Sequence, residues 1–112
     1  MKLMNIADDG AQYKWQLYDL YDKAFPEQEK KPLQIMENLV ADNRMEMLAM
    51  VDEDEFVGLA INLIDTEQNR ALLDYYAIVP EKRSGGYGSK GLEVLLDRFK
   101  NQKYIFEIET QD

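Results

Sequence analysis

The glycines of this sequence gather at one place, and that placement limits the folds open to the chain. Gly85, Gly86 and Gly88 fall within four residues, between a run rich in Leu, Tyr, Ile and Val and a run with apolar side chains at helical spacing. Glycine permits positive φ and lets a ligand approach the backbone closely. Such a passage from strand to helix can be a simple turn, but we interpret it as a binding loop because of its basic flanks.

Those flanks are Arg83 and Lys82 before the glycines and Lys90 after Gly88. The first N–H groups of the following helix have no partner within that helix. Together with glycine backbone they make an anion site, to which an arginine can add charge-assisted contacts. The pattern therefore predicts that a pyrophosphate binds at this loop.

The rest of the chain predicts an α+β fold in a single domain of residues 1–112. Asp8 or Asp9 is expected to cap a helix that runs to Phe25, and Pro32 to open a second helix. Ile35 and Met36 belong to the apolar stripe of that helix, and Leu95 and Leu96 to the stripe of the helix after the loop. The expected order is β-α-α-β-β-β-α-β, with strands at 1–7, 45–51, 56–64, 71–79 and 104–108 and helices from Asp8 or Asp9 to Phe25, at 32–41 and at 89–102.

Residues 76–88 make the chain recognisable. An apolar strand ends before Pro80, and Arg83, Gly86 and Gly88 fill the fixed positions of Arg/Gln-x-x-Gly-x-Gly/Ala. This segment resembles the signature of the GNAT superfamily of N-acetyltransferases, and the element order fits the first part of that fold. The resemblance implies a mixed sheet flanked by helices, here without the family's usual C-terminal helix and two further strands.

The resemblance also implies a chemistry, namely transfer of an acetyl group from acetyl-coenzyme A to an amine of a small molecule or peptide. The strand ending at Ile78 and Val79 would offer backbone groups to the pantetheine arm, with an amide near Ile78 facing the oxyanion. The loop amides would hold the pyrophosphate. The implied cofactor-binding residues are Ile78, Val79, Arg83, Ser84, Gly85, Gly86, Tyr87, Gly88 and Ser89.

The catalytic groups are less constrained. The chain has no histidine and no cysteine, so proton transfer falls to Asp, Glu, Tyr, Lys, the backbone or water. Glu107 is our first choice as general base, because its strand lines the acceptor gap in the family. Asp74, which we expect on the same strand face as Tyr76, is a second acidic candidate. Acidic side chains on edge strands often only face solvent, and that alternative stays open.

Two further patterns have competing readings. Residues 86–91 also read as Gly-x-Gly-x-x-Gly, typical of dinucleotide-binding oxidoreductases. However, no further βαβ units follow to complete a parallel sheet. The four acidic residues 52–55 lack the spacing and glycine of a calcium loop. We therefore expect a solvated turn there, no dinucleotide fold and no metal site.

The distribution of charge along the chain limits the kinds of partner that it can bind. Residues 80–103 carry six basic and three acidic side chains, whereas the remainder carries seven basic and nineteen acidic ones. An acidic body disfavours nucleic acid and favours a cationic acceptor, although acidity can also serve solubility alone. No apolar run is long enough for a membrane span and no signal peptide is apparent, so we expect a cytoplasmic protein.

The expected short C-terminus has a consequence for assembly. A last strand without its usual neighbours leaves an unpaired edge, and such edges pair with other chains. We therefore expect a homodimer. A catalytically weak coenzyme A-binding or dimerising module is the alternative to an active enzyme.

Overall fold

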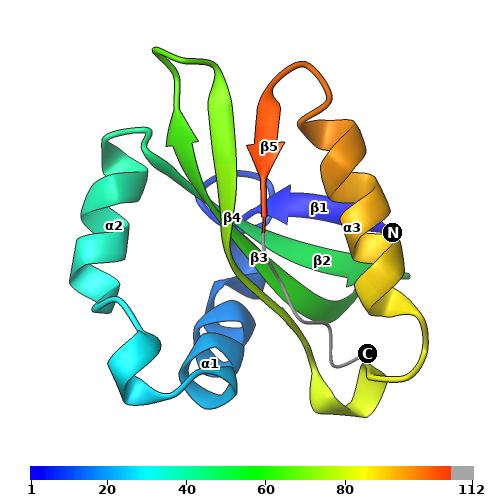
Figure 1. Cartoon of the computed structure of the whole chain (residues 1–112). Coiled ribbons are helices and arrows are strands. Elements are labelled where there is room, and N and C mark those ends of the chain that lie inside the picture. The colour runs from blue at the N-terminus through cyan, green and yellow to red at the C-terminus, as the bar shows by residue number, and fades with distance from the viewer. Residues whose placement is uncertain (107–112) are drawn as a thin grey trace.

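The computed structural model describes residues 1–106, which form one five-stranded sheet with helices on both faces (Figure 1). The element order agrees with the expected one, and short 3-10 turns precede α1, α2 and α3. The elements are β1 (Lys2–Asn5), α1 (Lys14–Ala24), α2 (Leu33–Ala41), β2 (Met45–Asp52), β3 (Glu55–Asp65), β4 (Arg70–Ile78), α3 (Tyr87–Arg98) and β5 (Lys103–Ile105).

The sheet is mixed, and its strands lie in the order β1-β2-β3-β4-β5. The pairs from β1 to β4 are antiparallel, and hairpin turns join β2 to β3 and β3 to β4. Helix α3 carries the chain back across the sheet, so β5 runs parallel to β4. A doubly wound dinucleotide fold needs a mostly parallel sheet. This arrangement therefore excludes the oxidoreductase alternative.

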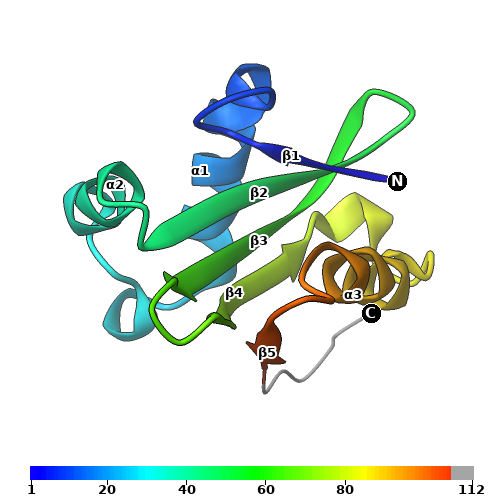
Figure 2. The same ribbon diagram turned by 90° about the horizontal axis from the view of Figure 1, so that it is seen from above.

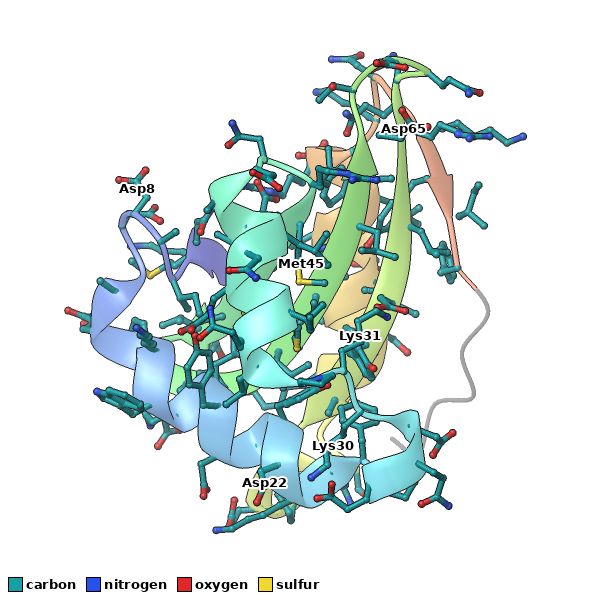
Figure 3. All side chains as sticks on the ribbon, turned by 90° about the vertical axis from the view of Figure 1, so that its left-hand side faces the viewer. Asp8, Asp22, Lys30, Lys31, Met45 and Asp65 are labelled. Atoms are coloured by element: carbon teal, nitrogen blue, oxygen red, sulfur yellow. The ribbon has the colours of Figure 1, made fainter. Side chains whose placement is uncertain are left out.

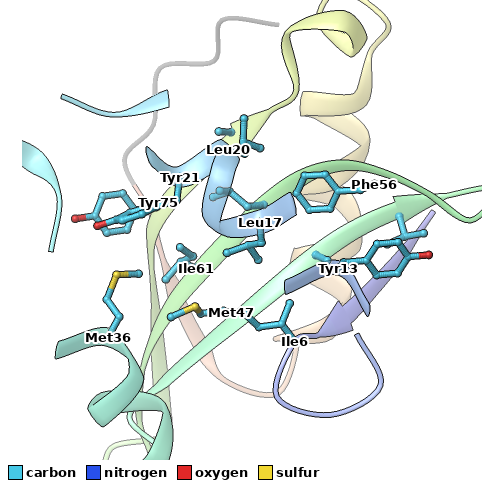
Figure 4. Close-up of a cluster of buried hydrophobic side chains, with 14 of the residues drawn as sticks. Ile6, Tyr13, Leu17, Leu20, Tyr21, Met36, Met47, Phe56, Ile61 and Tyr75 are labelled. Atoms are coloured by element: carbon cyan, nitrogen blue, oxygen red, sulfur yellow. The ribbon is translucent and has the colours of Figure 1, made fainter. Parts of the chain in front are cut away.

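Two apolar layers cover the sheet, with α1 and α2 on one face and α3 on the other (Figure 2). On the first face, Leu17 and Tyr21 of α1 and Met36 of α2 pack on Met47 and Ile61 (Figure 4). The second face buries Leu48, Ala60 and Leu73 under Leu95 and Phe99. Four of the six methionines are buried, at positions 36, 45, 47 and 50. Their flexible side chains fill the core.

The start of α1 differs from the expectation. The Asp9 carboxylate accepts the backbone N–H of Asn5 at 2.9 Å and so closes the turn after β1. No side chain caps α1, which begins only at Lys14 after a 3-10 turn at Ala11–Tyr13. Asp and Asn side chains stabilise turns as readily as they cap helices. Here the Asp9 carboxylate stabilises the turn after β1 and does not cap α1.

A bulge interrupts β4 at Asp74. Tyr75 pairs with Ile61 and Leu73 pairs with Asn62, so Asp74 has no opposite residue in β3. The extra residue shifts the side-chain alternation. Leu73 therefore packs in the α3 layer, whereas Tyr75 packs in the layer of α1 and α2.

Strand β5 pairs with only the first part of β4. The two strands pair from Arg70↔Lys103 to Leu72↔Ile105, side by side at one end of the sheet (Figure 1). Beyond Leu72 no described strand pairs with the outer edge of β4, which continues to Ile78. At about 3.3 Å per residue, this open edge is roughly 17 Å long.

Helix α3 can lie close to the sheet because residue 91 is glycine. A Cβ at Gly91 would collide with the Tyr76 hydroxyl and would lie 2.8 Å from Met50 Sδ. The Tyr76 hydroxyl in turn donates a hydrogen bond to the Gly88 carbonyl. Gly91 thus fixes the approach of the helix whose first turn follows the glycine-rich loop.

We expect Gly91→Ala to lower the free energy of unfolding by about 1–3 kcal/mol, the usual effect of overpacking. An exposed helical glycine would instead gain about 0.5–1 kcal/mol from alanine, so the sign of the change identifies the collision. Urea denaturation measures it, with the exposed neighbour Lys90→Ala as the control. Gly91→Ala in a Tyr76→Phe background should recover part of the loss, and stabilisation by Gly91→Ala alone would contradict the packing.

Candidate functional site

The glycine-rich loop leads from the open end of β4 into the first turn of α3. Ser84 and Gly86 adopt left-handed backbone, with φ of 69° and 79°, whereas Gly85 between them does not. Alternation of this kind directs successive N–H groups toward one side, as in anion-binding nests. Left-handed backbone is uncommon for serine. A strained residue at this position supports a binding role for the loop.

Gly86 and Gly88 differ in their surroundings. Gly86 caps α3 and has no atom within 4 Å of the place where a Cβ would lie. Its side of the loop is therefore open, and only its positive φ requires glycine. Gly88 is buried in the first turn of α3. Its lack of a side chain therefore serves the packing of the helix in addition to any role in ligand binding.

The acidic hairpin between β2 and β3 holds this loop in place. Glu53 and Asp54 form its tight turn, both with positive φ, and Asp52 pairs with Glu55 across it. Glu55 forms an ion pair with Lys82 at 2.5 Å. Asp52 accepts a hydrogen bond from the Tyr87 hydroxyl at 2.9 Å. The turn that we expected to be merely solvated therefore also clamps the loop, at Lys82 before the glycines and at Tyr87 between Gly86 and Gly88.

The clamp changes the electrostatics of the loop. The hydrogen bond from Tyr87 is the largest cause that lowers the pKa of Asp52. The hydrogen bond to Glu55 raises the pKa of Lys82, which remains charged but is paired. The positive charge available to an anion therefore comes chiefly from Arg83, Lys90 and the helix terminus.

Ile78 presents its peptide groups to the open edge of β4. Val79 donates its N–H to the Val57 carbonyl of β3. Because the peptide groups of successive residues in an antiparallel strand point to opposite sides, those of Ile78 point away from β3. The Ile78 carbonyl accordingly accepts a hydrogen bond from Arg83 Nε at 3.2 Å on the other edge. Arg83 thereby folds the loop back against the end of the strand.

The structure brings the predicted cofactor-binding residues into one region, from the end of β4 to the first turn of α3. Glu107, the predicted general base, lies outside the described residues. Asp74 does not share a face with Tyr76, because the bulge turns Tyr76 to α3 while Asp74 contacts Lys31 on the other side.

A groove of about 830 Å³ opens beside the loop, on the face of the sheet that α1 covers. Its walls come from α1, from the acidic hairpin and from the segment that enters the loop. Its charged lining is mixed in sign, and it consists of Asp19, Lys23, Glu55, Glu81, Lys82 and Arg83. Sequence reasoning missed this groove, since no spacing along the chain links α1 to residues 79–83.

Comparisons with known proteins agree with this geometry. The model of the acetyltransferase (GNAT) family matches residues 14–112. No protein of curated function matches the sequence significantly. Among solved structures, a GNAT-family protein from Bacteroides thetaiotaomicron has a TM-score of 0.83 at 20% identity, covering 99% of this chain and 62% of its own. This chain therefore spans less than two thirds of that relative.

Two more solved structures extend the likeness. Tetrahymena GCN5 has a TM-score of 0.73 at 16% identity, over 97% of this chain and 71% of its own. An aminoglycoside 6'-N-acetyltransferase complexed with coenzyme A has a TM-score of 0.67 at 20% identity, over 94% of this chain and 58% of its own. At such identities the structural likeness shows a shared fold.

Other classes of site find no support in the described part of the chain. Residues 1–106 contain no group of three or more acidic side chains placed to hold a metal ion. Within the same residues, no helix combines the length and apolarity of a membrane span.

We expect Tyr87→Phe to destabilise the protein at neutral pH, because Asp52 loses the hydrogen bond that favours its charged form. A lowered pKa contributes stability above the usual titration range of aspartate, and this contribution is lost as pH falls through the folded-state pKa. The difference between variant and wild type should therefore shrink in acid. Urea denaturation across a pH series measures it, and a difference that grows in acid would contradict the assignment.

Proposed function

Because the chain belongs to the GNAT family of acetyltransferases, we propose that it transfers an acetyl group from acetyl-coenzyme A to an amine. The observation that carries the proposal is that the open edge of β4 leads directly into the glycine-rich loop. Family membership supports acetyl transfer in general. The identity of the co-substrate and the class of acceptor are part of the proposal.

The residues present fit coenzyme A. A pyrophosphate needs converging N–H groups, which the left-handed backbone at Ser84 and Gly86 and the first turn of α3 provide. A pantetheine arm carries amides that can pair with a strand edge, and β4 from Leu73 to Ile78 offers such an edge. A family member of the same fold was solved with coenzyme A.

Binding of the arm requires a local exchange at Ile78. Its carbonyl accepts the Arg83 side chain at 3.2 Å, and an amide of the arm would compete for the same acceptor. Displacement would free the guanidinium for the phosphates, where a charge-assisted hydrogen bond is stronger than one to a neutral carbonyl. Arg83 would thus exchange one partner for another when the co-substrate binds.

The reaction needs an acceptor amine in its neutral form next to the thioester. The amine nitrogen would attack the thioester carbonyl, the C–S bond would break, and the coenzyme A thiolate would leave with a proton from solvent or an acid. A backbone N–H of the open edge near Ile78 would donate to the developing oxyanion. Glu107 remains our proposal for the base.

We propose a cationic acceptor. The acidic residues outside 80–103 favour ammonium compounds by long-range attraction. Solved relatives include enzymes named for aminoglycosides, spermidine and ribosomal-protein alanine, which are all amines. Homodimerisation stays a prediction, and it rests on the outer edge of β5, which has no partner strand among residues 1–106.

We expect Gly86→Val to abolish measurable acetyl-coenzyme A binding in calorimetry, because valine is strongly disfavoured at φ of 79° and the nest would be lost. Gly86→Asn is the matched control, since asparagine tolerates left-handed backbone. It should retain binding. Equal affinity of the valine variant and wild type would refute the cofactor site.

Turnover is tested separately by release of coenzyme A thiol with a panel of amines. We expect release with cationic amines, and lower rates as salt screens the attraction. A protein that binds acetyl-coenzyme A but releases no thiol with any amine would instead support the alternative, a coenzyme A-binding module.

A further inference from the structure

The connection between α1 and α2 is fixed onto β4 around Lys31. Its backbone N–H donates to the Tyr75 hydroxyl at 3.2 Å, and its carbonyl accepts the Tyr21 hydroxyl at 2.9 Å. The Tyr75 hydroxyl also donates to the Glu29 carbonyl at 2.6 Å. These bonds hold the main chain of Lys31 against the sheet and leave only its side chain free to move.

The Lys31 side chain ends in a small cation-binding site. Its Nζ lies 2.5 Å from Asp74 Oδ2 and 5.2 Å from the centre of the Tyr75 ring. A carboxylate and an aromatic face both bind ammonium groups in proteins. The Tyr75 ring is itself held by edge-on contacts with Tyr21 and Phe25 at about 5 Å. The site is therefore rigid on the protein side.

This site lies just beyond the point where the pairing of β4 with β5 ends. Asp74 is the bulge residue, two positions after the last pair of the two strands at Leu72. If a pantetheine arm follows the open edge of β4 away from the loop, its acyl end lies toward Asp74. This step rests on the proposed function.

We propose that Asp74 and the Tyr75 ring bind an ammonium group of the acceptor, and that Lys31 occupies their site when the acceptor is absent. A nitrogen held there is protonated and cannot attack a thioester. The reacting nitrogen is therefore a second one, and the acceptor is a diamine or a polyamine. The bound ammonium anchors it while its other amine reaches the open edge of β4.

Exchange of Lys31 for an acceptor costs little. The side chains of Lys31 and Asp74 are 35% and 19% exposed, so water reaches the pair. Partly exposed ion pairs contribute modestly, because solvent replaces what is lost. When Lys31 swings into water, its main chain stays bound to Tyr75 and Tyr21, and the incoming ammonium restores the contact with Asp74. No refolding of the connection is required.

The test removes the internal competitor. Lys31→Met keeps an unbranched apolar stem and deletes the ammonium, and binding of 1,4-diaminobutane is followed by NMR through the ring signals of Tyr75. We expect about fivefold tighter binding than in wild type, equivalent to about 1 kcal/mol at tenfold per 1.4 kcal/mol. Adding Asp74→Asn should abolish the gain. Lys31→Gln repeats the measurement if the methionine variant folds poorly.

Lys30→Met is the matched control, because it removes the same charge one residue earlier. Lys30 contacts Asp22 and Glu27 at 2.8 and 2.9 Å, and Figure 3 shows it beside Asp22. It should leave diamine binding unchanged. Three outcomes would each overturn the proposal. Lys30→Met could raise diamine affinity as much as Lys31→Met does, Lys31→Met could leave the affinity unchanged, or the increase could survive Asp74→Asn. None of these measurements involves acetyl-coenzyme A, so the proposed function is judged independently by the Gly86 variants.

Discussion

The bulge at Asp74 is the constraint on which the proposed acceptor site depends. One extra residue in β4 shifts the side-chain alternation, so Leu73 packs under α3 while Tyr75 packs under α1. The Asp74 carboxylate therefore lies beside Lys31 of the α1–α2 connection. The pairing of β4 with β5 ends at Leu72, two residues before the bulge, so the open edge of β4 includes it. Without it, β4 would present Leu73 and Tyr75 to the same helical layer.

The second constraint is the acidic hairpin between β2 and β3, which clamps the glycine-rich loop through Lys82 and Tyr87. A loop that must present backbone N–H groups gains from being held before the ligand arrives, since ordering it during binding would cost affinity. The clamp neutralises one lysine, so binding would depend more on geometry than on net charge. This explains how a chain with a net charge of −9 can offer a local anion site.

Element order and core composition were predictable because hydrophobic periodicity is a local property. The predictions were wrong where another contact, local or tertiary, competed. Asp9 closes a local turn instead of capping α1. Ile35 and Leu96, assigned to apolar stripes, are about half exposed, whereas their neighbours Met36 and Leu95 are fully buried in the layers against the sheet. The helical pattern gives a stripe, but its exact centre depends on where the helix meets the sheet.

The sequence by itself determined the family and the glycine-rich loop, and it predicted a pyrophosphate site there, since these follow from residues adjacent in the chain. Only the tertiary structure decided the bulge, the clamp on the loop and the contact of Lys31 with Asp74, which are 43 residues apart. A bulge reflects the register between two strands, and an ion pair reflects the packing of a connection on a sheet. Neither leaves a pattern in the residues of one segment, because each depends on distant parts of the chain meeting.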